Sequence, residues 1–173
     1  MGEKVCAVPF RQTSQGMEVL SFLHPVAGRQ FVKGTLEPNE LPAVAAAREL
    51  REESGLSLAA SPVLLGDAMI GSPPVRWHFY AFNTDGLPQS WSHWTEDDGG
   101  HMFLFFWHLL EKDLDREWHP IFHQAYRIIR FGLRDIAGPV PQGAASKAGA
   151  RRVSDKQFSI GRSPTFSAPS RRD

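Results

Sequence analysis

The sequence lacks the features that stabilise small secreted proteins or anchor membrane proteins. Only one of its 173 residues, Cys6, is a cysteine, which excludes an internal disulfide framework and a zinc site made of cysteines alone. No apolar run approaches the ~20 residues that a membrane-spanning helix needs. The first residues, MGEKVCAVPF, have neither the long apolar region nor the cleavage site of a signal peptide, so we expect a cytoplasmic protein without a membrane partner.

An excess of charge of one sign is also missing. The 19 Lys and Arg residues balance the 19 Asp and Glu residues, so no overall field favours nucleic acid, which is therefore not the expected partner. Only the C-terminal part is basic, and its ARR and SRR clusters leave an additional contact with phosphates open.

The composition indicates one folded domain and a tail. Apolar residues make up 42% of the chain, which is enough for a buried core, and the length fits one domain at residues 1–137. Residues 138–173 are rich in Gly, Pro, Ser and Arg and nearly free of large apolar side chains. Because such a segment buries too little surface to offset its loss of entropy on ordering, we expect a disordered basic tail.

Hydrophobic patterns and turn residues predict six strands and two helices. The helices are expected at 41–54, which begins near Pro42 and ends before Gly55, and at 119–136, where apolar residues form one stripe. The strands are expected at 4–10, 17–23, 29–33, 63–70, 75–83 and 101–109. These elements predict an α+β domain or a layered α/β/α domain.

The first predicted helix carries three carboxylates on one face, which we expect to be exposed. At 100° per residue, Glu49, Glu52 and Glu53 fall within an arc of about 100°. Like charges at these spacings destabilise a helix, and Arg48 offsets only one of them, through its i,i+4 relation to Glu52. A glutamate-rich helix face is usually only solvated, but a bound cation would also explain this one. The residues expected to pack on the sheet lie toward the other side: Ala43, Ala46, Ala47, Leu50 and Ser54.

A hard divalent cation fits these carboxylates. Mg²⁺ prefers oxygen ligands and is usually bound by one or two carboxylates together with substrate phosphates. A metal in this position would neutralise a diphosphate and acidify an attacking water. Gly34 allows the chain to turn sharply before the helix and to offer its carbonyl to the metal, and the helix N-terminus at 41–43 favours phosphate.

The segment around the helix resembles a known family. From Gly34 to Leu56 the sequence runs GTLEPNELPAVAAARELREESGL, which resembles the Nudix box of the Nudix hydrolases at every defining position over 23 residues. Five residues separate Gly34 from Glu40, and seven more precede RELREESGL at 48–56. The resemblance implies an α/β/α sandwich with a mixed sheet. It also implies hydrolysis of a diphosphate linkage in a nucleoside diphosphate derivative, with Mg²⁺ or Mn²⁺ as cofactor.

The resemblance also implies roles for individual residues. Glu49, Glu52 and Glu53 would bind the metal, with Glu53 the most critical, and one of them or an acid elsewhere would be the general base. Arg48 would orient these carboxylates through ion pairs. Glu40 would stabilise the junction between loop and helix.

Candidates outside the box are predicted from residue type and position. Lys33 is a candidate for phosphate binding, and Phe31 for stacking on a base, although solvated lysines and core aromatics are the common alternatives. The consecutive acids Glu96, Asp97 and Asp98 are candidates for a further metal ligand, or form a solvated turn. Further aromatic candidates for base stacking are Trp77, Phe79, Trp91 and Trp94.

Some alternatives stay open at this stage. A Nudix-fold module that binds nucleotides without catalysis is the main alternative, although such modules typically have degraded boxes and this box is intact. The short signatures that separate substrate subclasses are not cleanly present, so the nucleoside diphosphate derivative is not specified. A homodimer is compatible with the sequence.

Overall fold

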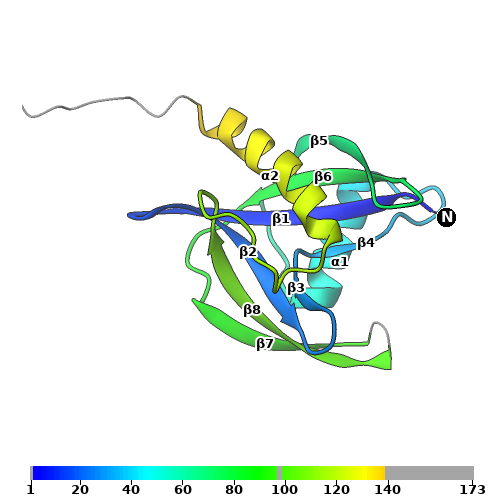
Figure 1. The fold of residues 1–173 in the computed structure, drawn as a ribbon, viewed down its shortest axis with the longest axis horizontal. Coiled ribbons are helices and arrows are strands. Elements are labelled where there is room, and N and C mark those ends of the chain that lie inside the picture. The colour runs from blue at the N-terminus through cyan, green and yellow to red at the C-terminus, as the bar shows by residue number, and fades with distance from the viewer. Residues whose placement is uncertain (1, 97–98, 139–173) are drawn as a thin grey trace, which may run out of the picture. The chain divides into compact units, whose positions relative to one another are not determined.

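The computed structural model describes residues 2–96 and 99–138 (Figure 1). The expected disordered tail, apart from Gly138, and the candidate ligands Asp97 and Asp98 therefore lie outside the described residues. No helix in the described ranges is long and apolar enough to cross a membrane.

A single mixed sheet of eight strands forms the centre of the domain, in the order β5-β6-β1-β2-β8-β7. Two short strands lie off this path, where β3 pairs with β2 and β4 pairs with β1. Only β1 and β6 run parallel, and the other pairs are antiparallel. The strands are β1 (Lys4–Thr13), β2 (Gly16–His24), β3 (Gly28–Gln30), β4 (Lys33–Thr35), β5 (Val63–Ile70), β6 (Val75–Asn83), β7 (Ser90–Thr95) and β8 (His101–Leu109).

The two helices, α1 (Pro42–Ser54) and α2 (Ile121–Ala137), cover opposite faces of the sheet (Figure 1). Successive residues of a strand point to opposite faces, so β1 contributes to two cores. Val5 and Ala7 pack in the core under α1, whereas Cys6 and Val8 pack in the core under α2. The predicted α/β/α sandwich with a mixed sheet is confirmed.

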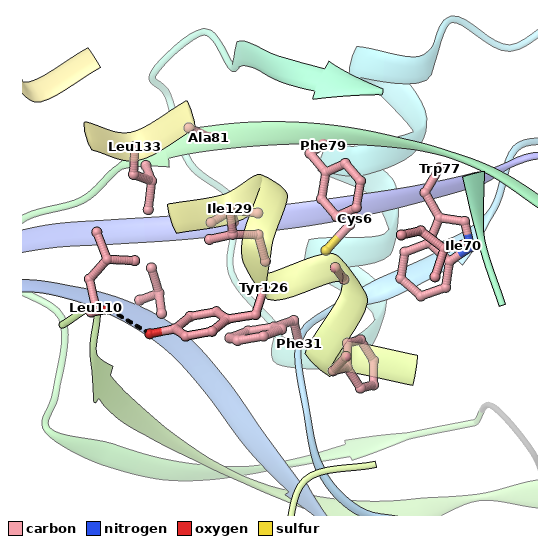
Figure 2. Close-up of a cluster of buried hydrophobic side chains, with 14 of the residues drawn as sticks. Cys6, Phe31, Ile70, Trp77, Phe79, Ala81, Leu110, Tyr126, Ile129 and Leu133 are labelled. Atoms are coloured by element: carbon pink, nitrogen blue, oxygen red, sulfur yellow. Dashed lines mark hydrogen bonds between the residues drawn. The ribbon is translucent and has the colours of Figure 1, made fainter. Parts of the chain in front are cut away.

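The core under α2 is rich in aromatic residues (Figure 2). Phe31 and Tyr126 stack with ring centroids 5.6 Å apart, and the Tyr126 hydroxyl donates a hydrogen bond of 2.8 Å to the Leu110 carbonyl. Burial raises the pKa of the Tyr126 hydroxyl, so this group stays protonated as a donor. Cys6 is fully buried in the same core, as expected for a packing residue.

The predicted elements are present with ends that differ by at most three residues, as for β1, which was expected at 4–10 and extends to Thr13, except at two places. The strand expected at 29–33 is divided, because β3 ends at Gln30 and β4 begins at Lys33. The second difference is β7, SWSHWT, which was not predicted. Its serines and histidine give little strand signal in the sequence, and β7 is defined by its antiparallel pairing with β8.

Helix α1 has the predicted ends but a different buried face. Pro42 is its first residue, and Gly55 ends it in the left-handed region, with φ 77° and its N–H bonded to the Arg51 carbonyl. Ala45 is buried, whereas Ala47 is exposed, so the expectation that Ala47 packs on the sheet is wrong. The buried face is rotated toward the glutamates and consists of Ala45, Ala46, Glu49, Leu50, Glu53 and Ser54.

Candidate functional site

Arg48 joins the start of the box to the helix through five hydrogen bonds. Its Nε and Nη2 atoms donate to the two carboxylate oxygens of Glu40, each at 2.9 Å. Its Nη1 atom donates to Glu49 at 2.9 Å and to Glu52 at 3.0 Å. Nη2 also donates to the Thr35 carbonyl at 3.0 Å. We call these five residues the Arg48 cluster. The expected ion pairs of Arg48 are therefore present, and one of them joins Glu40 in the loop to Arg48 in the helix.

The electrostatics of the Arg48 cluster favour the charged forms of Glu40 and Arg48. Hydrogen bonding from Arg48 lowers the pKa of the Glu40 carboxyl. The same bond raises the pKa of the Arg48 guanidinium against the opposing effect of desolvation, and Glu49 raises it further. One guanidinium thus lies among three carboxyl groups, so acidic groups outnumber basic ones in the cluster, an arrangement that suits a bound cation.

Gly34 lies directly against the Glu49 carboxylate. It belongs to β4, where it pairs with Val5 of β1, and a Cβ atom added to it would lie 1.7 Å from the Cδ of Glu49. No side chain fits in that space, so glycine is required by the close approach of strand and carboxylate. This contact brings the Gly34 backbone and the helix carboxylate together, as a shared metal site requires.

Glu53 is buried, with 5% of its surface exposed, and Glu49 is equally buried. The expectation that the whole acidic face is exposed is therefore wrong for these two residues, whereas Glu52 is exposed. Glu53 lies close enough to β1 that its charge adds to burial in raising the pKa of the Cys6 thiol. The face of α1 that was expected to be exposed is thus largely covered, because the carboxylates of Glu49 and Glu53 lie against the sheet.

The glutamates line a cavity of about 730 Å³. On one side it is bounded by Gly34 and the three helix glutamates, and Lys33 contributes to its lining, so the predicted site residues of the box and Lys33 are brought together. Another part of the lining is aromatic and polar and was not predicted. It consists of Phe22, His24, Gln30, His101, Phe103 and His119.

The donors in the cavity fit a hard divalent cation by their chemistry. Three carboxylates and the Gly34 backbone provide oxygen ligands, which Mg²⁺ and Mn²⁺ prefer. Within residues 2–96 and 99–138, no group of three His, Cys, Asp or Glu side chains converges as a ready metal cluster. Glu49 and Glu52 instead each direct an oxygen to Arg48. The metal ligands therefore stay a prediction.

Two predicted site residues lie apart from the cavity. Phe31 is fully buried between Trp118, Phe122 and Tyr126, so its predicted stacking on a base is wrong. Glu96 is exposed and does not line the cavity, so the structure does not bring it together with the helix glutamates.

The other aromatic candidates for base stacking also lie outside the cavity lining. Trp77 and Phe79 are buried in the core under α2, and Trp94 is 57% exposed. Trp91 stacks on Phe105, and its Nε1 donates to the Ser54 carbonyl at the end of α1 at 3.0 Å. Trp91 therefore contacts the end of α1 and does not line the cavity.

Comparisons with solved structures show the same fold. The NUDIX domain of Shewanella oneidensis NrtR, complexed with ADP ribose, has a TM-score of 0.57 at 15% identity, with 78% of this chain and 89% of that chain covered. The Bacillus subtilis pyrophosphohydrolase BsRppH has a TM-score of 0.55 at 18% identity, with 78% and 82% covered. The Nudix hydrolase RenU from M. smegmatis has a TM-score of 0.54 at 15% identity, with 82% and 90% covered.

The family is established by the sequence match over most of the domain. No curated protein is similar enough in sequence to count as a relative. A family model described as the NUDIX domain matches residues 4–120, which include every strand, helix α1 and the box from Gly34 to Leu56. With this match and the sandwich fold, the chain belongs to the NUDIX domain family.

Proposed function

We propose that this protein hydrolyses a diphosphate linkage in a nucleoside diphosphate derivative, using Mg²⁺ or Mn²⁺. The observation that carries the proposal is the Arg48 cluster at the rim of the cavity. Arg48 fixes Glu49 and Glu52 from one side, and Gly34 lies against Glu49 from another. Four hydrogen bonds from one arginine orient three carboxylates, which suits a site where carboxylate positions determine the rate.

The box residues that line the cavity, together with Lys33, then have chemical roles. Glu49, Glu52, Glu53 and the Gly34 carbonyl would hold the cation, which when bound supplies charge neutralisation and acidification of water. One of the glutamates accepts the proton of the attacking water. Lys33 lines the same cavity and would counter the charge of the phosphate groups. The carboxylates of Glu49 and Glu52 repel each other, and the hydrogen bonds from Arg48 hold them together.

The similar structures support this class of substrate. One was solved with ADP ribose, and another is a pyrophosphohydrolase. ADP ribose contains a diphosphate, and a pyrophosphohydrolase cleaves a diphosphate linkage, so both agree with a substrate of this class.

A nucleotide-binding module without catalysis is the second candidate. It predicts binding of nucleoside diphosphate derivatives without product release. The complete Arg48 cluster favours catalysis, because a binding module has no need to orient Glu49 and Glu52 for a reaction.

A substrate panel in ¹⁸O-labelled water tests the proposal. The full chain is incubated with nucleoside triphosphates, ADP-ribose and dinucleoside polyphosphates, with Mg²⁺ or Mn²⁺ and with a chelator. We expect cation-dependent release of a nucleoside monophosphate or diphosphate, with one ¹⁸O atom in a phosphate product because water attacks phosphorus. Tight binding of these compounds with no turnover under any of the metal conditions would favour the binding module instead.

A further inference from the structure

Gln30 is a buried amide at the surface of the cavity. Its exposed fraction is 7%, and it contributes to the cavity lining. Within residues 2–96 and 99–138, its side chain forms no hydrogen bond with another residue. Neither amide atom of Gln30 is among the fully buried side-chain atoms that lack a partner, so both atoms keep access to the cavity. The donor and acceptor of Gln30 are therefore available to whatever enters the cavity.

The backbone around Gln30 is fixed on both edges of β3. On one edge, Gln30 pairs with Phe22 of β2. On the other edge, the N–H of Arg29 donates to the Glu117 carbonyl at 2.9 Å, and the carbonyl of Arg29 accepts from the N–H of His119 at 3.0 Å. The following residue, Phe31, is fully buried in the core. The side chain of Gln30 is therefore presented from a rigid support, which limits the entropy lost on binding.

Rings of β2 and β8 lie beside Gln30. Phe22, its cross-strand neighbour, stacks on Phe103 with centroids 4.3 Å apart and planes at 17°. The His24 ring lies 5.2 Å from Phe103 and 4.8 Å from His101. We call Phe22, His24, His101 and Phe103 the ring wall. All four line the cavity together with Gln30.

The polarity of the His24 ring is set by its own turn. Its Nδ1 atom accepts the backbone N–H groups of Val26 at 3.1 Å and Ala27 at 3.0 Å. With Nδ1 as an acceptor, the proton of the neutral ring is on Nε2. The ring wall therefore has one histidine of fixed orientation and tautomer, next to an amide that offers both a donor and an acceptor.

We propose that Gln30 determines substrate specificity by binding the edge of a nucleobase against the ring wall. This inference rests on the proposed function and names the part of the substrate that the same cavity recognises. A glutamine amide pairs with two adjacent polar atoms of a base through one donated and one accepted hydrogen bond. A cavity of about 730 Å³ is within the range that holds a nucleotide-sized ligand. The base lies at Gln30, and the phosphates extend toward Lys33 and the helix glutamates.

Binding without metal tests this inference apart from catalysis. Calorimetric titrations of the full chain compare the four common nucleoside monophosphates with ribose 5-phosphate, which lacks only the base. For the wild type, we expect at least one nucleotide to bind about 10- to 100-fold more tightly than ribose 5-phosphate. Gln30→Met keeps the length of the side chain and removes both polar atoms, so it should abolish most of that preference.

The matched control is Gln12→Met, because Gln12 is exposed on β1 and does not line the cavity. It should keep the wild-type preference. Melting temperatures report folding of each variant. Should Gln30→Met fail to fold, Gln30→Asn withdraws the amide by one methylene and is expected to weaken the same preference.

The outcomes separate the inference from the proposed function. Base preference that is absent in the wild type, or that survives in a folded Gln30 variant, overturns the role of Gln30. If cation-dependent hydrolysis is found in either of those cases, the proposed function stands. Base preference that depends on Gln30, without hydrolysis of any compound, supports the inference and leaves a binding module in place of an enzyme.

Discussion

Gly34 and Glu49 are in such close contact that an added Cβ on the glycine would lie 1.7 Å from the glutamate Cδ. Strand β4 therefore limits where the carboxylate of α1 lies, while Arg48 donates to it at 2.9 Å. The position of the Glu49 carboxylate therefore depends on β4, through Gly34, and on its own helix α1, through Arg48.

Gly34→Ala should displace Glu49 and lower cation-dependent turnover by about 100-fold. Overpacking at a buried contact should also destabilise the protein by about 1–3 kcal/mol, measured by denaturant unfolding. The double variant Gly34→Ala with Glu49→Ala removes the clashing carboxylate and should recover most of the lost stability without recovering activity. Equal destabilisation of the single and double variants would show that the contact is not the cause.

Arg48→Lys should lower kcat by about 100-fold although the charge is kept. A lysine ammonium is a point charge and does not reproduce the two parallel bonds to Glu40 together with those to Glu49 and Glu52. Arg51→Lys is the matched control, because Arg51 is 61% exposed and its nearest ion-pair distance, to Glu52, is 3.8 Å. Wild-type turnover in Arg48→Lys would mean that orientation of the carboxylates does not limit the rate.

Trp91→Phe tests the support of α1 by β7. Phenylalanine keeps a ring on Phe105, whose centroid lies 5.0 Å from that of Trp91, and loses the hydrogen bond to the Ser54 carbonyl. We expect a loss of about 1 kcal/mol in the free energy of unfolding. Trp94→Phe, at a position 57% exposed, should change it by less than about 0.5 kcal/mol. Equal free energies of unfolding for the two variants would show that the Trp91 hydrogen bond does not stabilise α1.

His108 should make the protein less stable below neutral pH. Desolvation by burial lowers the pKa of His108 from its ordinary value of 6.5, so the unfolded chain takes up the proton more readily than the folded one. The contribution of His108 to stability is complete above about pH 6.5 and is lost as the pH falls toward the folded pKa.

Thermal unfolding from pH 7.5 to 5 measures this contribution. His108→Gln keeps a donor for the Lys112 carbonyl, which the His108 ring contacts at 2.9 Å, and removes the titration. Its melting temperature should decline less between pH 7 and 5 than that of the wild type. His123→Gln, at an exposed position of α2, serves as the control. A steeper decline in His108→Gln would contradict the lowered pKa of His108 in the folded protein.

The predicted site residues that line the cavity lie within one continuous segment, at 33–53. From Gly34 to Leu56 the spacing indicates a turn, a helix and a set of carboxylates with Arg48 beside them. The structure adds the partners of Arg48, which include Glu40 from the preceding loop. The parts that were not predicted depend on contacts between distant segments.

Three residues illustrate why these parts were missed. Helical periodicity placed Glu53 on a solvent face, but β1 and β4 lie against that side of α1, so Glu53 is 5% exposed. Gln30 is one amide in a three-residue strand. Its place at the cavity depends on the pairing of β3 with β2 and on the hydrogen bonds of the neighbouring Arg29 backbone with Glu117 and His119. Phe31 follows it on the opposite face and enters the core.

If a cation held by the glutamates of α1 activates water, then removing one carboxylate charge should abolish most of the turnover, and Glu53→Gln removes that charge. Glutamine has the same shape and lacks the charge, so the fold should persist while cation affinity and proton acceptance are lost. Turnover of the best panel substrate is measured against Mg²⁺ concentration for the wild type, Glu53→Gln and the control Glu111→Gln, whose side chain is 60% exposed and pairs with Arg134.

We expect wild-type and Glu111→Gln turnover to saturate with Mg²⁺ and to vanish with a chelator. Glu53→Gln should lower kcat by about 100-fold or more, equivalent to about 2.7 kcal/mol of transition-state stabilisation, while its melting temperature stays near the wild-type value. Either of two results would show that water is not activated by a cation held at Glu53. One is wild-type turnover that survives the chelator, and the other is a folded Glu53→Gln variant with wild-type kcat and Mg²⁺ midpoint.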